Sequence, residues 1–367
     1  MVRKWLASFF PSPKKHEEIQ IISLHDRLQL NKKWQKKAPV STLTSQETTI
    51  VQTILKETYR LNLNNVTRTR AYWSLYRRTP ELHWAFLAHM VSRNAGWNMT
   101  DLKSILNQLL SYDQTAVFFR FLEKANYLIF EDAYPQLLLY EKSKKDRKDW
   151  SYLLPHFGVS SFMTPIWELF IEQKSPERDL LAVALIINEQ HFLEKQVMEN
   201  TFFQEKVIQS FSFQMQELLG LTHILFPFVQ SGRIELSGLS VQQFSSLPSR
   251  IDIGKSLYTL LFKSPDVLKG SSLFAEKNPH TGSRTDYYPD LFTVQKTPLK
   301  LYSPSLSSVW PNQIHPPEKR KDWFDPEQEI LHFFSLPKTT SAGPMSEKHL
   351  AAMIKLSGLN HFHKLIP

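Results

Sequence analysis

Apolar residues recur every three to four positions along most of the chain, which is the spacing of one face of an α-helix. Residues 48–63 show this pattern clearly, and residues 81–93 and 180–187 are apolar almost throughout, as in helices buried on several sides. The same reasoning predicts further helices over residues 101–110, 113–123, 135–145, 165–172, 177–200, 201–226 and 253–262. The fold class expected from the pattern is mostly α.

Polar and small residues predict where some of these helices begin and end. Thr79 is expected to cap the helix over 81–93, with Pro80 in its first turn, where the missing N–H costs nothing. The segment 94–96 should end that helix, and Thr100 should cap the next one. Residues 234–241 fit either a short hairpin or a loop.

The composition changes after residue 264. Residues 265–344 hold eleven of the 22 prolines, which excludes long helices, but they also hold ten Tyr, Trp and Phe residues, which a solvated linker would lack. We therefore expect one large multi-helix domain with a proline-rich irregular arm. Its predicted parts are a basic N-terminal arm (1–44), a helical core (45–264), the proline-rich and aromatic-rich arm packed on the core (265–344), and a C-terminal helix and tail (345–367).

Charge is concentrated at the N-terminus. The chain carries a net charge of +9, and residues 1–37 contribute nine basic and three acidic side chains, a net +6. Within them, residues 2–10 form a short amphipathic helix pattern. It would either lie on an anionic membrane surface or dock on the protein's own body. Its apolar face consists of Val2, Trp5, Leu6, Phe9 and Phe10.

Metal and cofactor chemistry is not predicted. The chain has no cysteine, which excludes disulfides, thiolate metal sites and a thiol nucleophile. His83 and His89 are six residues apart, so they do not share a helix face and cannot chelate one ion. Gly254-Lys255-Ser256 imitates the end of a phosphate-binding loop, but Ser249 stands where the motif needs glycine. We expect no metal and no cofactor.

Arginines are dense in one stretch, with Arg60 followed by Arg68, Arg70, Arg77 and Arg78 and no acid between Glu57 and Glu81. Arginine forks bind phosphate and the interleaved aromatic residues could stack on bases, so nucleic acid is one hypothesis. The alternative is that these arginines pair with acids of the body. The second reading is favoured because the body outside the N-terminal arm is nearly neutral.

Several polar residues interrupt otherwise apolar helices or lie in the turn-rich segment 278–289. They would either converge on a ligand pocket centred on Arg93, Glu189 and Arg284, or brace the arm to the helices through buried pairs. The residues concerned are His89, Arg93, Asn94, Asp101, Asp132, Asn188, Glu189, His280, Arg284 and Asp286.

Long strings of the sequence resemble a known family. They are T-R-T-R-A-Y (67–72), P-E-L-H-W-A-F-L-A-H-M-V-S-R-N-A-G-W-N-M-T-D-L (80–102), E-D-A-Y-P-Q-L-L-L-Y-E (131–141), A-L-I-I-N-E-Q-H-F-L-E (184–194) and H-T-G-S-R-T-D-Y-Y-P (280–289). They are similar to a domain of unknown function in endospore-forming Firmicute bacteria, over roughly residues 45–295. The resemblance implies a bacterial cytosolic or membrane-peripheral protein and carries no activity or catalytic residue.

The leading functional hypothesis is a cytoplasmic, non-catalytic protein that binds a protein partner, with an anionic membrane surface as a possible site of action. One alternative is a ligand-binding protein or enzyme with an arginine–glutamate pocket. The other is a nucleic-acid-binding protein that uses the stretch from Arg60 to Arg78.

Overall fold

The computed structural model describes residues 17–36, 42–107, 109–172, 177–210, 223–241, 244–316, 321–339, 345–351 and 353. The predicted amphipathic segment 2–10 lies outside these residues. The last predicted helix is helical over its described residues 346–351. None of the described helices is long and apolar enough to cross a membrane.

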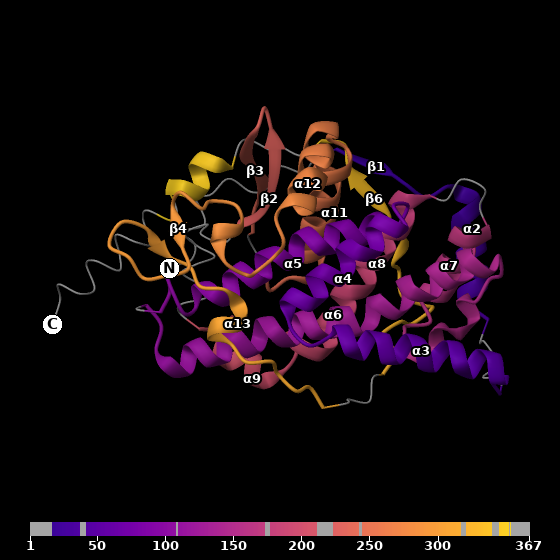
Figure 1. The fold of residues 1–367 in the computed structure, drawn as a ribbon. Helices are drawn as coiled ribbons and strands as arrows, with labels where there is room; N and C mark the ends of the chain where they lie inside the picture. The colour runs from indigo at the N-terminus through magenta and orange to yellow at the C-terminus, as the bar shows by residue number, and fades with distance from the viewer. Residues whose placement is uncertain are drawn as a thin grey trace, which may run out of the picture.

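The fold is mostly α-helical, as predicted, and long helices form its centre (Figure 1). In α8, every residue from Leu180 to Asn188 is buried, because apolar side chains cover all sides of this part of the helix. The main helices are α2 (Leu24–Trp34), α3 (Ser45–Leu61), α4 (Asn65–Arg78), α5 (His83–Asp101), α6 (Tyr112–Asp146), α7 (Met163–Glu172), α8 (Arg178–Leu193), α11 (Leu247–Phe262) and α12 (Pro265–Lys277).

Short elements connect and cover these helices. Two antiparallel pairs and one parallel pair of strands occur: β1 (Glu18–Gln20) with β6 (Ser335–Pro337), β2 (His223–Gln230) with β3 (Arg233–Ser240), and β4 (Phe292–Thr293) with β5 (Leu301–Tyr302). The short helical turns are α9 (Thr201–Phe203), α13 (Leu306–Val309), the 3₁₀ turns η1 (Ser151–Phe157), η4 (Arg284–Asp286) and η5 (Leu331–Phe333), and the π turns η2 (Glu194–Met198) and η3 (Gln204–Ile208).

Two predicted helix boundaries are wrong. Thr79 does not cap α5; it follows α4, where its hydroxyl donates to the Leu75 carbonyl at 2.7 Å. The helix does not end at 94–96 either, because α5 runs through Gly96 to Asp101. Residues 102–107 form turns instead of the first part of the helix predicted over 101–110.

The helices predicted over 113–123 and 135–145 are one helix, α6, which continues through Pro135. Proline in a helix interior costs about 3 kcal/mol because it removes one hydrogen bond and crowds the preceding turn. Here the ring is buried beside Tyr134 and Leu137, so packing of the surrounding turns offsets that cost.

The helix predicted over 201–226 is helical over 201–208 but does not extend to Phe226, because residues 223–230 form β2 instead. They pair with β3 across a turn at Ser231 and Gly232, both of which have positive φ (50° and 78°). Such a two-residue turn matches the twist of a hairpin. The prediction for residues 234–241 was a short hairpin within that segment or a loop, and neither is present, because residues 233–240 form the single strand β3. Leu225 and Phe226 of β2, which point to opposite faces of the strand, are both buried.

The chain after α12 packs on the helices through side-chain and backbone hydrogen bonds. The indole of Trp310 donates to the carbonyl of Met99 in α5 at 2.8 Å, and the indole of Trp323 donates to Asn188 in α8 at 2.9 Å. The proline-rich stretch does contain one helix of 13 residues, α12, which the prediction excluded. Its proline stands at the first position, where a helix tolerates it.

Candidate functional site

A buried polar network joins α4 and α5 to the segment after α12. Its hub is Asn65, whose amide donates to the Ser92 carbonyl at 2.8 Å, so that its Oδ1 accepts from His280 Nε2 at 2.9 Å. His280 Nδ1 faces the Asp286 carboxylate at 3.1 Å. A Cβ at Gly96 would overlap both Asn65 Oδ1 and His280 Nε2, so only glycine leaves room for this bond between segments. Burial lowers the pKa of His280.

Arg93 and His89 lie on one face of α5, as predicted, and bond to each other. Arg93 Nε donates to His89 Nε2 at 3.1 Å, while the other ring nitrogen of His89 meets the Thr69 carbonyl at 2.8 Å. The Arg93 guanidinium also donates to the Asn278 carbonyl and lies 4.9 Å from the Phe274 ring centre. Burial lowers the pKa of Arg93 to about 10. This pair therefore connects α5 with the end of α12.

Arg284 pairs with Asp101 at the end of α5. Its Nε donates to both carboxylate oxygens, at 2.9 and 3.0 Å, and its Nη2 donates to Oδ2 at 2.6 Å. Both side chains are buried, and each neutralises the charge of the other. Either charge would be costly to bury without its partner. Asn94 makes a third connection, because its amide exchanges two hydrogen bonds with the backbone of Leu225 in β2.

Asp132 and Asn188 belong to a different network, between α6 and α8. Asn188 Nδ2 donates to Asp132 Oδ2 at 2.6 Å, and Gln136 Nε2 donates to the same oxygen at 3.0 Å. Burial raises the pKa of Asp132 to about 7 and that of neighbouring Glu189 to about 8. Within the described ranges, no hydrogen bond or ion pair links Glu189 to Arg93 or Arg284. The predicted pocket residues are thus divided between two networks.

The arginine stretch does not form one basic face. Arg68 is buried and pairs with Glu123, whereas Arg77 and Arg78 contact Glu276 and Glu141 at the surface. Arg60 likewise pairs with Glu57. Arg70 alone in the stretch has no carboxylate partner among the residues that the structure describes.

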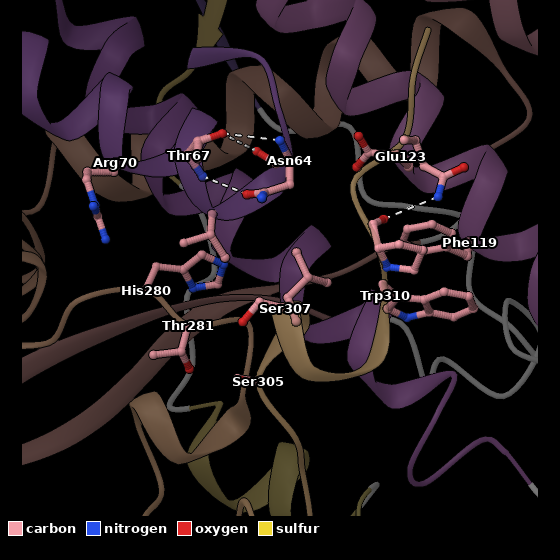
Figure 2. Close-up of a pocket in the computed structure, with 14 residues that line it drawn as sticks. Asn64, Thr67, Arg70, Phe119, Glu123, His280, Thr281, Ser305, Ser307 and Trp310 are labelled. Atoms are coloured by element: carbon pink, nitrogen blue, oxygen red, sulfur yellow. Dashed lines mark hydrogen bonds between the residues drawn. The ribbon is translucent and has the colours of Figure 1, made fainter. Parts of the chain in front are cut away.

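Arg70 lines a cleft of about 290 Å³ between α4, α6 and the chain around α13 (Figure 2). In the view of Figure 2, Arg70 and Glu123 lie on opposite sides of Thr67 and Asn64, and His280 and Ser307 lie below them. Phe119 and Trp310 stack with ring centres 3.9 Å apart and form an apolar wall. Among the described side chains, no three His, Asp or Glu residues group to hold a metal ion.

Among the residues that sequence reasoning missed, Asn65 and Glu123 matter most for these sites. A signal for the first was present: Asn65, Arg68, Thr69 and Tyr72 follow helical spacing and form the buried stripe of α4. This stripe predicts that Arg68 is buried and needs an acid. Nothing near Arg68 in the sequence identifies its partner Glu123, which lies 55 positions further along the chain.

These features define a mostly α-helical protein in which buried polar side chains fasten the segment after α12 to the long helices. Residues 60–356 match the family model described as "Protein of unknown function (DUF2515)", so the chain belongs to that family. The uncharacterized protein YppC of Bacillus subtilis (strain 168) is 41% identical over 277 residues, covering 75% of this chain and 83% of the relative. No solved structure matches significantly. The resemblance drawn from the sequence strings is confirmed.

Proposed function

We propose that this protein acts by binding, as a peripheral protein of an anionic membrane surface, and that its location is the cytoplasmic face of that membrane. The observation that carries the proposal is the outer face of α2. Leu24 and Leu28, four residues apart on that face, are 74% and 63% exposed. Lys32, one turn further, and Lys36, just after the helix, are also exposed. An apolar strip with neighbouring lysines is the pattern of a surface-lying amphipathic helix.

The opposite face of α2 is fixed to the body. Trp34 is buried and its indole donates to the Phe162 carbonyl at 3.0 Å, and Lys33 pairs with Glu168 in α7 at 2.8 Å. The helix therefore presents Leu24 and Leu28 outward from a rigid support. Figure 1 shows α2 and α7 together at one end of the molecule.

The energy of this face alone is modest. Burying a leucine contributes about 1.5–3 kcal/mol, and each lysine near an anionic surface about 1 kcal/mol. Two of each give about 5–8 kcal/mol, which corresponds to a dissociation constant no tighter than about micromolar. Stable attachment thus needs a second element, and residues 2–10 of the basic N-terminal arm are proposed to supply it.

Co-sedimentation with vesicles tests the proposal. The protein should sediment with phosphatidylglycerol-containing vesicles, less so with phosphatidylcholine vesicles, and binding should weaken with salt. Leu24→Glu combined with Leu28→Glu should reduce binding strongly, and deletion of residues 1–13 should reduce it independently. Leu299→Glu, at a position 93% exposed on another part of the chain, is the matched control and should bind normally. Equal sedimentation of the double variant and the control would refute the role of α2.

The nucleic-acid alternative receives less support. It needs a continuous basic surface, but Arg68 is buried and its partner Glu123 neutralises it. The carboxylates that pair with Arg77 and Arg78 reduce the positive electrostatic potential that would attract phosphate groups to this surface. A nucleic-acid affinity that falls steeply with salt would restore that alternative.

A further inference from the structure

The cleft of Figure 2 has walls from three separate parts of the chain. Thr67 and Arg70 come from α4, Phe119 and Glu123 come from α6, and the residues around α13 close the third side. Its volume is about 290 Å³. A small organic molecule fits such a space.

Arg70 supplies positive charge to the cleft. It lies two positions after Arg68 on α4, which turns the two side chains about 200° apart round the helix. Arg68 therefore points into the core, while Arg70 is exposed and lines the cleft without a described carboxylate partner. The hydroxyl-bearing residues Ser305 and Ser307 line the same cleft.

Glu123 supplies an acceptor at a different point of the cleft. Its side chain is 3% exposed and lines the cleft, and its Oε2 accepts from Arg68. Among the described residues, the other oxygen, Oε1, has one donor contact, a long one of 3.5 Å with His315 Nε2. Arg68 and His315 outweigh burial and lower the pKa of Glu123, so the carboxylate is ionised. An ionised, buried carboxylate oxygen whose described contact is this long can accept a closer donor.

We propose that the cleft binds a small dipolar molecule, with a phosphate or carboxylate group at Arg70 and a hydrogen-bond donor, an ammonium or hydroxyl group, at Glu123. The two protein groups have opposite charge and lie apart, so a ligand with separated charges satisfies both. A simple anion would meet Arg70 but would offer no close donor to Glu123 Oε1, whose described contact is the long one with His315. The stacked rings of Phe119 and Trp310 contact the apolar linker between the two ends. This site is independent of the membrane-binding face of α2.

Isothermal titration calorimetry with two matched probes tests the site. Aminopropyl phosphate carries both a phosphate and an ammonium group, whereas propyl phosphate lacks only the ammonium. A hydrogen bond to a charged group contributes enough for about a tenfold gain or more, so aminopropyl phosphate should bind at least about tenfold more tightly. The ligand comparison examines Glu123 without mutating it, which matters because its removal would leave Arg68 charged and unpaired in the core.

The matched variants are Arg70→Ala and Arg120→Ala. Both arginines are exposed on long helices without a described ion-pair partner, but only Arg70 lines the cleft. Arg70→Ala should weaken binding of both probes at least about tenfold, and Arg120→Ala should leave it unchanged. Equal affinity of wild type and Arg70→Ala, equal affinity for the two probes, or no binding of either probe at millimolar concentration would each overturn the proposal. A circular dichroism spectrum of each variant verifies the fold.

Discussion

Replacing Gly96 with alanine should destabilise this protein, although the same change in the interior of an ordinary helix stabilises it. Gly96 lies inside α5, where alanine normally gains about 1 kcal/mol over glycine. Here the added methyl group would occupy the space in which His280 Nε2 meets Asn65 Oδ1. Both atoms belong to buried residues, so neither can turn to water when the bond breaks.

The magnitude follows from these contacts. A buried polar group left without a partner costs about 1–3 kcal/mol, and two such groups cost about 4 kcal/mol at the middle of that range. After subtraction of the helix gain of about 1 kcal/mol, the free energy of unfolding should fall by about 3 kcal/mol. Urea denaturation followed by tryptophan fluorescence measures this fall as a lower midpoint with an unchanged slope.

A double-mutant cycle separates the steric cause from a general effect of the substitution. His280→Ala removes one of the two atoms that the new methyl group would meet and breaks the bond beforehand. In that background Gly96→Ala should cost much less than in the wild type, giving a coupling energy of about 2 kcal/mol or more. A higher urea midpoint for Gly96→Ala alone would show that the close approach does not constrain the fold.

Two further predictions concern buried charges. Asp132→Asn imitates the protonated carboxyl. Because the folded-state pKa of about 7 is above the ordinary value of 3.8, the wild type loses stability as pH rises between these values. Relative to Asp132→Asn, the wild type should lose on the order of 2 kcal/mol between about pH 5.5 and 8.5, and parallel urea midpoints would contradict this. Arg284→Met should cost about 3–5 kcal/mol because Asp101 is left buried and unpaired, and Asp101→Asn should recover part of that loss in denaturation curves of the double variant.

Local patterns in the sequence were sufficient for much of the helical structure. The predicted helices over 48–63 and 165–172 correspond to α3 and α7, and the buried middle of α8 was identified from its apolar run. These features depend on the spacing of side chains along one helix. Caps and breaks were less predictable, because Gly96 could equally end a helix or admit a close neighbour.

The hairpin of β2 and β3 shows where local reasoning fails. Residues 223–229 are apolar enough for a buried helix, and a short apolar run does not distinguish helix from strand. Pairing with residues 233–240 decides the outcome, because each strand satisfies the other's backbone groups. The turn at Ser231 and Gly232 was the available signal, but serine at positive φ is an uncommon choice for it.

The candidate sites were predictable by residue type but not by pairing. His280, Arg284 and Asp101 were recognised as polar groups in need of partners, and the structure gives each of them one. The partners lie up to 215 positions away, as Asn65 does from His280. Spacing along a helix carries no information about such distances. For the same reason, the sequence did not indicate that the residues predicted to line a pocket around Arg93, Glu189 and Arg284 are divided between two hydrogen-bonded networks.

The polar network and the cleft are physically linked, because His280 belongs to both. The wall of the cleft that comes from the segment after α12 is held in place by two hydrogen bonds. One joins His280 to Asn65, and in the other the Thr100 hydroxyl donates to the Gly282 carbonyl at 2.7 Å. A ligand that touches both Arg70 and the arm side binds only while that wall is in place. It would then stabilise the folded arm by about 2.7 kcal/mol at a concentration of one hundred times its dissociation constant. Gly96→Ala should accordingly weaken aminopropyl phosphate binding, and saturating ligand should restore part of the stability that the substitution removes.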